Sequence, residues 1–277
     1  MTTPSDSYLM NNIEETLRLE IKTDPEEVKK QALWCGVKPG LNVLDAGCGP
    51  GKVTSILHEL LQPGGKILGM DYSEERILYS TERYGQKPGI DFMVHDLREP
   101  IKKAGPFDII WVRFVLEYNR VESPEIIKNL TTCLKPGGYL CLLDLDHNCL
   151  NHYELSGKME KTMFELIDAL EQNSNFDPYA GRKLYSYLFD LGYQNLQMDL
   201  RAHHLFYGKM KDKDFFNWIK KVEVTSKKNK SLFKNYPGGH QAFFSDFSKF
   251  FLDPRRFTYT PLIFCKGMKP LSSSGGK

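Results

Sequence analysis

The sequence predicts an α/β fold built on a doubly wound, mostly parallel seven-stranded sheet, with N-terminal lid helices and a helical cover inserted late in the chain. Strand-like and helical segments alternate from residue 41 to residue 145. Several strand-like runs are almost continuously apolar, which is typical of strands covered by helices on both faces. Glycine and proline pairs stand between the segments, where turns are needed.

The first predicted elements are two helices. From Leu9 to Ile21 an apolar residue recurs at every fourth position, which indicates an amphipathic helix. Asp24 then offers an N-cap that is followed by proline, and a second helix is expected to run to about Cys35 and to stop at Gly36.

The next hundred residues form the predicted sheet core. The strand-like runs are 41–46, 66–71, 90–94, 107–112 and 139–145. The helical runs between them are 51–61, 74–84 and 123–134. This alternation predicts parallel strands joined by right-handed crossovers.

The character of the chain changes after residue 150, where 14 of its 17 phenylalanines lie. Helices are expected at 154–172, 182–191, 212–225 and 239–252, and the last two strands at 194–207 and 257–266. We therefore divide the chain into lid helices (1–38), a core (39–150), a completion of the sheet with a helical cover (151–270) and a disordered tail (271–277).

Composition excludes several classes of protein. The 277 residues carry a formal net charge of +2, which gives no general case for nucleic acid or membrane binding. No apolar run approaches the length of about 20 residues that a membrane helix needs, and the N-terminus does not resemble a secretory signal. The six cysteines form no CxxC pair, so neither a zinc site nor a disulfide framework is indicated and a cytoplasmic location is expected.

A glycine-rich turn follows the first strand. Asp45 precedes three glycines at alternate positions, Gly47, Gly49 and Gly51. A dinucleotide site favours GxGxxG with phosphates at the helix N-terminus, whereas a carboxylate at this point repels a pyrophosphate and suits a ligand with an ammonium group. S-adenosylmethionine (SAM) has that group and no phosphate.

Five motifs in order resemble those of class I SAM-dependent methyltransferases of the small-molecule type. They are residues 45–51, 69–73, 94–97, 107–118 and 134–140. The resemblance covers about residues 8 to 266. It implies the Rossmann-like fold, methyl transfer from SAM to a small organic acceptor, and S-adenosylhomocysteine as product.

The resemblance also implies cofactor-binding residues. The backbone of Gly47, Cys48, Gly49 and Gly51 would pass under the ligand, with Asp45 near its amino-acid end. Asp71 would accept hydrogen bonds from both ribose hydroxyls, because a carboxylate has two acceptor oxygens. The remaining positions are Tyr72 and Leu97 beside the adenine, Asp96 at its amino group, and Arg113 near the methionine part.

Further candidates lie outside the core motifs. Tyr8 and Arg18 resemble a lid segment that closes over the cofactor, and 175–182 resembles a loop-to-helix element of the same subgroup. His147, at the end of the fifth strand, is the candidate for a general base, since the pKa of histidine lies near neutrality. The lysine-rich run 209–234 is interpreted as a solvated helical face with its aromatic residues packed inward.

Alternatives remain open at this point. An aminopropyltransferase on the same fold needs extra acids for a polyamine; none stands out after strand 4, where Arg113 opposes a cation. A non-catalytic SAM-binding protein and, more distantly, a dehydrogenase are the others. No sequence pattern identifies the acceptor, distinguishes O-, N-, C- or S-methylation, or decides between a monomer and a homodimer. No metal, membrane or nucleic-acid partner is expected.

Overall fold

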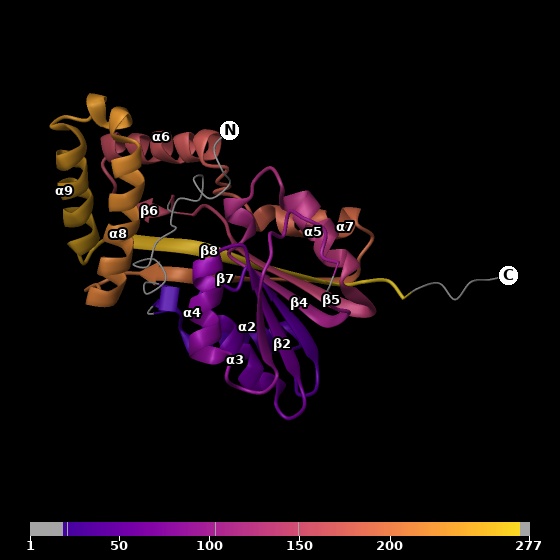
Figure 1. Ribbon diagram of the computed structural model, residues 1–277. Helices are drawn as coiled ribbons and strands as arrows, with labels where there is room; N and C mark the ends of the chain where they lie inside the picture. Colours follow the sequence, from indigo (N-terminus) through magenta and orange to yellow (C-terminus); the bar gives the residue numbers. More distant parts are fainter. Residues whose placement is uncertain (1–18, 21, 103, 149, 272–277) are drawn as a thin grey trace.

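The computed structural model of the protein (Figure 1) describes residues 19–20, 22–102, 104–148 and 150–271. These residues contain one eight-stranded sheet in the order β3-β2-β1-β4-β5-β8-β6, with β7 paired to β8. The predicted fold class is confirmed. The strand beyond the seven expected is the two-residue β6, His152–Tyr153.

Five parallel strands form the first half of the sheet. They are β1 (Asn42–Ala46), β2 (Lys66–Asp71), β3 (Ile90–Val94), β4 (Phe107–Arg113) and β5 (Leu134–Leu145). The chain moves outward from β1 to β2 and β3, then returns to place β4 on the other side of β1. In open α/β sheets this point of reversal is where ligands bind, beyond the carboxyl ends of the strands.

The second half of the sheet is antiparallel. β8 (Phe257–Met268) lies between β5 and β7 (Gln194–Phe206) and runs opposite to both. The two long strands cross the whole molecule in Figure 1 and connect the parallel core with the late helices. The expected last strands at 194–207 and 257–266 are therefore confirmed.

Helices cover both faces of the parallel strands. They are α2 (Pro25–Cys35), α3 (Lys52–Leu61), α4 (Glu74–Tyr84), α5 (Ser123–Thr132) and α7 (Leu184–Asp190). Successive residues of β4 show the alternation: Ile109 and Trp111 pack in one buried cluster with α2 and α3, and Ile110 in another with α5 and α7. A strand buried on both faces explains why these runs are almost continuously apolar.

The helical cover has a core of its own. It consists of α6 (Gly157–Asn173), α8 (Asp212–Lys228), the 3-10 helix η4 (Lys230–Asn235) and α9 (Gly239–Leu252). In Figure 1 these helices stand together at one end of the sheet, apart from α5 and α7. Phe243, Phe247 and Phe251 are completely buried there, so these aromatic residues of α9 pack within the cover.

The lysine-rich run follows the predicted pattern only in part. Trp218 and Phe233 are buried in the cover as expected, because they lie on the inward face. Phe216 on the same helix remains 54% exposed. The first predicted helix and the tail predicted to be disordered (271–277) lie almost entirely outside the described residues.

Candidate functional site

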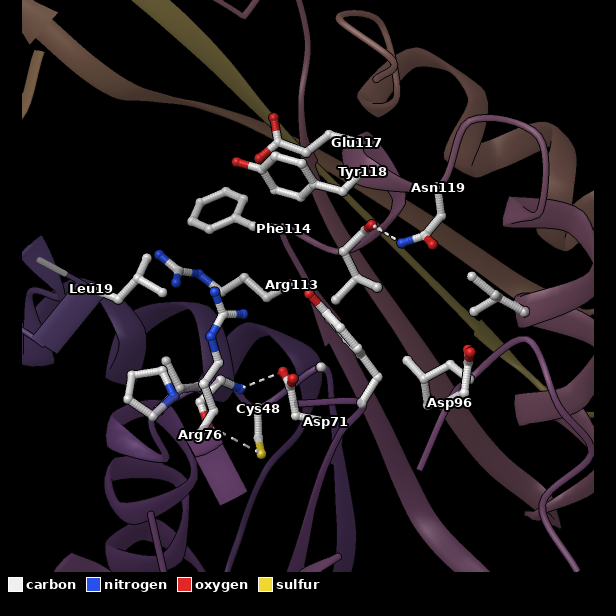
Figure 2. Close-up of a pocket in the computed structure, with 18 of the residues that line it drawn as sticks. Leu19, Cys48, Asp71, Arg76, Asp96, Arg113, Phe114, Glu117, Tyr118 and Asn119 are labelled. Atoms are coloured by element: carbon white, nitrogen blue, oxygen red, sulfur yellow. Dashed lines mark hydrogen bonds between the residues drawn. The ribbon is translucent and has the colours of Figure 1, made fainter. Parts of the chain in front are cut away.

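A cavity of about 200 Å³ lies beyond the carboxyl ends of β1, β2, β3 and β4. Four turns contribute to it, together with Leu19, Lys22 and Thr23 from the start of the described chain and Ser174 and Asn175 from the loop after α6. The cavity therefore occupies the point where the strand order reverses. Figure 2 shows Cys48 and Asp71 at one end of it and Glu117 and Tyr118 at the other.

The glycine turn after β1 is held down on β2. The backbone N–H groups of Gly47 and Cys48 both donate to the carbonyl of Met70, at 2.7 and 2.9 Å. Gly47 has φ +77°, and a Cβ there would lie 2.4 Å from Val115 Cγ2, so only glycine fits. A Cβ on Gly49, which lines the cavity, would meet no protein atom within 4 Å, and this leaves the space above the turn open.

Asp45 lies at the end of β1 beneath the turn and does not line the cavity. Its Oδ2 accepts a 2.6 Å hydrogen bond from the Thr54 hydroxyl. Burial raises the pKa of Asp45 to about 7, against the opposing effects of Thr54 and Arg113. Gly51, the residue before α3, also stands outside the cavity lining.

Asp71 stands at the end of β2 and lines the cavity, as Tyr72 does. Its two carboxylate oxygens accept from the backbone N–H groups of Gly49 (2.9 Å) and Ser73 (3.0 Å). Burial raises the pKa of Asp71, and the nearby Arg76 opposes this shift. Because each oxygen has a second lone pair, the carboxylate keeps acceptor capacity for a ligand.

Asp96 and Leu97 line the cavity in the turn after β3. The Asp96 carboxylate pairs with Arg98 through its guanidinium and its backbone N–H. These hydrogen bonds lower the pKa of Asp96, so it is ionised at neutral pH.

Arg113 is the last residue of β4 and places a half-buried cation in the cavity. Its Nε donates to Gln31 Oε1 on α2 at 2.9 Å, and its guanidinium lies 4.0 Å from the centroid of the Phe114 ring. Burial lowers the pKa of Arg113 to about 10, against the attraction of Asp45 and Asp144.

One acidic residue of the cavity, Glu117, is not among the site residues expected from the sequence. Glu117 belongs to the 3-10 helix η2 (Leu116–Tyr118) after β4, is only 2% exposed and lines the cavity. The expectation that no acid stands out after strand 4 is therefore wrong. Glu117 lies in the fourth motif, but its spacing gave no signal that it faces the cavity, because the backbone of η2 is held by a distant residue, Asp144, through the N–H groups of Leu116 and Glu117.

The candidates outside the core motifs do not all lie at the cavity. His147 does not line the cavity; it has φ +48°, and its ring meets the Tyr179 ring edge-on with centroids 5.1 Å apart. Tyr8 and Arg18 lie outside the described residues. From the loop-to-helix element, Asn175 reaches the cavity, whereas Arg182 pairs with Asp146 at 2.8 Å.

Two further properties bear on the chemistry of the site. Within the part of the chain that the structure describes, no cluster of three or more His, Cys, Asp or Glu side chains could hold a metal ion. No helix of that part combines the length and the apolar character needed to cross a membrane.

Comparison with known proteins gives one family match and many relatives. A family model described as a methyltransferase domain matches residues 37–203, more than half of the chain. A demethylmenaquinone methyltransferase of Lactococcus lactis is 29% identical over 135 residues, 46% of this chain and 53% of its own. A chloroplastic 2-phytyl-1,4-β-naphthoquinone methyltransferase of Arabidopsis thaliana is 29% identical over 118 residues, 41% of this chain and 45% of its own. The chain spans about half the length of these relatives.

Solved structures share the fold over nearly the whole chain. A methyltransferase-like protein of Bacillus halodurans superposes with a TM-score of 0.58 at 17% identity, covering 88% of this chain and 99% of its own. A phosphoethanolamine N-methyltransferase of Haemonchus contortus, solved with S-adenosylhomocysteine, gives 0.59 at 15% identity, covering 93% of this chain and 57% of its own. At these identities the likeness concerns the fold alone.

Proposed function

Since this chain belongs to the methyltransferase-domain family, we propose that it transfers a methyl group from SAM to a small organic acceptor. The observation that carries the proposal is the meeting of the glycine turn, Asp71 and Asp96 in one cavity at the reversal of the strand order. The two relatives described above are methyltransferases by name.

The residues of the cavity suit this cofactor. We assign the vicinal ribose hydroxyls to Asp71, whose two oxygens are already oriented by the N–H groups of Gly49 and Ser73. Tyr72, Asp96 and Leu97 lie in the same cavity, where they would hold the adenine.

The amino-acid end of the cofactor belongs between the open turn and the cation. Gly47 and Gly49 offer close backbone approach, and Arg113 supplies a charge for a carboxylate. Asp45 lies below the turn, and we assign it an indirect role: it fixes Thr54 in the first turn of α3.

The bound cofactor supplies an electrophilic methyl group on a sulfonium. The protein then has to align the acceptor with that methyl group and to exclude water. Holding the reacting atoms close together in the right orientation lowers the activation barrier substantially. Phe114 and Tyr118 line the cavity and provide apolar walls for this purpose.

The cysteines and the net charge bear on location and on the partner. The five cysteines among the described residues are all free and buried, which supports the cytoplasmic location that we propose. We propose a small molecule rather than a nucleic acid as partner, since the net charge is only +2. For the assembly we propose a monomer or a homodimer.

Two measurements test the proposed function. Isothermal titration calorimetry should show binding of SAM and of S-adenosylhomocysteine, and no binding of NADH. Release of S-adenosylhomocysteine, followed over a panel of hydroxyl, amine and thiol compounds, should then find the acceptor class. NADH binding without SAM binding would contradict the proposal, and SAM binding without any turnover would favour a non-catalytic SAM-binding protein.

A further inference from the structure

A residue of β5 holds the backbone of η2, and with it Glu117, at the cavity. After β4, the Oδ2 of Asp144 on β5 accepts from the backbone N–H groups of Leu116 (2.9 Å) and Glu117 (3.2 Å). These bonds fix η2 against the sheet. The backbone from which the Glu117 side chain extends is therefore fixed at the end of the cavity opposite Asp71 (Figure 2).

The carboxylate of Glu117 is oriented by a chain of hydrogen bonds that reaches the helical cover. The Nδ2 of Asn148 donates to Glu117 Oε2 at 2.6 Å, and the Nζ of Lys221 on α8 donates to Asn148 Oδ1 at 3.0 Å. Asn148 is completely buried. Because the Asn148 amide donates to an anion and accepts from a cation, the arrangement is polarised in one direction.

Several charged groups face Glu117. Burial raises its pKa, whereas Lys221, Lys22 and hydrogen bonds from Asn148 and Tyr118 lower it. Asp144 lies behind it, and burial together with the Glu117 charge raises the Asp144 pKa. The net effect raises the Glu117 pKa above its ordinary value, because burial outweighs the opposing groups. A carboxylate whose pKa is shifted towards neutrality suits a group that gains and loses a proton.

The cations at this end select against an amine acceptor. Lys22 lines the same cavity, and Lys221 stands behind Asn148; both act on the Glu117 charge. A positively charged acceptor would be repelled by these groups. An acceptor that gives up a proton becomes an anion, which the same cations stabilise.

The walls of this end are aromatic. Phe114 and Tyr118 line it, and Lys22 lies 5.7 Å from the centroid of the Phe114 ring. Flat rings offer offset or edge-to-face contacts to another aromatic ring. A ring with a hydroxyl group combines the aromatic surface with the proton that Glu117 can accept.

We propose that Glu117 binds the hydroxyl of a hydroxyaromatic acceptor and takes up its proton, while Asn148 and Lys221 act as positioning residues for its carboxylate. The O–H bond breaks towards Glu117, which becomes a neutral carboxylic acid. The electron pair left on the acceptor forms the bond to the methyl carbon, and the pair of the breaking carbon–sulfur bond stays on sulfur. The proton leaves to solvent with the product. This inference rests on the proposed function.

The test compares E117Q with E125Q, which changes an exposed acid of α5 that pairs with Lys128. The probes are 1-naphthol and the more acidic 4-nitrophenol, and the readout is S-adenosylhomocysteine release. E117Q should bind SAM as the wild type does, yet lose about 100-fold or more in kcat/KM with 1-naphthol. The loss should be much smaller with 4-nitrophenol at a pH where it is already ionised, whereas E125Q should be unaffected.

Each outcome decides between the proposals. An equal loss with both probes, or no loss, overturns the role of Glu117 as proton acceptor. If the wild type binds SAM but methylates neither probe, the hydroxyaromatic class is wrong while SAM binding stands. If the wild type does not bind SAM, the proposed function itself fails, and this inference fails with it.

The positioning role of Lys221 has its own readout. K221M removes a positive charge that lowers the Glu117 pKa, so the acidic limb of the kcat/KM profile should move to higher pH. K220M is the matched control, because Lys220 on the same helix pairs with Glu223 at 3.2 Å. Identical profiles for K221M and K220M would show that Lys221 contributes packing alone.

Discussion

The carboxylate of Asp71, at the end of β2, accepts a 2.9 Å hydrogen bond from the backbone N–H of Gly49 in the turn after β1. One side chain thus joins the two motifs that were separate signals in the sequence. The second oxygen of Asp71 is held by the Ser73 N–H. The group assigned to the ribose is therefore also a brace for the glycine turn.

Replacing Asp71 tests this double role. Asp71→Ala removes an acceptor for the ribose hydroxyls and leaves the Gly49 N–H without its partner. We expect SAM binding to weaken by about 1–3 kcal/mol, the range for hydrogen bonds that involve a charged group. Calorimetry gives the affinity. Asp91→Asn, at an exposed position of β3, is the control and should bind SAM normally; equal affinities for both variants would remove Asp71 from the cofactor site.

Gly47 should tolerate no side chain. Gly47→Ala would force a φ of +77° on alanine and bring its Cβ to 2.4 Å from Val115 Cγ2. We expect a loss of about 1–3 kcal/mol in the free energy of unfolding, measured in urea. Gly40→Ala is the matched control, since Gly40 has φ +84° but nothing within 4 Å of its Cβ position, and it should lose less.

A second variant separates the two causes at Gly47. Combining Gly47→Ala with Val115→Ala removes the clash and keeps the strained φ. The double variant should recover part of the stability that Gly47→Ala loses. If it recovers nothing, backbone strain alone accounts for the effect.

Asp45 should make the stability depend on pH. Its pKa in the folded protein is about 7, whereas an unfolded aspartate titrates at about 3.9. Between these values the folded state holds a proton that the unfolded state has lost, so the contribution of Asp45 to stability falls as pH rises through this window. The largest slope for one group is about 1.4 kcal/mol per pH unit.

Asp45→Asn removes that titration. The stability of the variant relative to the wild type should therefore rise steadily from about pH 4 to pH 7 and level off above. Urea unfolding at several pH values within this range measures it. A difference that does not change with pH would mean that Asp45 is ionised throughout.

The start of the described chain is fastened to α4. The hydroxyl of Tyr84 donates to Glu20 Oε1 at 2.7 Å, next to Leu19 and Lys22, which line the cavity. Tyr84→Phe should loosen this segment, and we expect faster SAM dissociation in stopped-flow experiments. The control is Tyr79→Phe on the same helix, for which the rate should not change. Equal rates for both variants would show that the Tyr84 contact does not retain the cofactor.

Much of the fold follows from local patterns in the chain. α2 ends at Gly36, where φ is +91°, as the glycine predicted. The apolar runs became strands buried on both faces, and the turn 47–51 lies at the end of β1. Such features depend on residues that are close in the sequence. The spacing of apolar residues and the position of glycine and proline in a short segment are enough to predict them.

What the sequence by itself determined is the fold class, the order of the elements and the cofactor motifs that define the family. What only the tertiary structure decided is the acceptor end of the cavity. Glu117, Asn148 and Lys221 come from β4–α5, β5–β6 and α8, and their contacts span 31 and 73 residues. The periodicity of the sequence does not predict such a contact. The orientation and the pKa of a buried carboxylate depend on distant donors and cations, and the packing of the sheet against the helical cover decides which of them lie close to it.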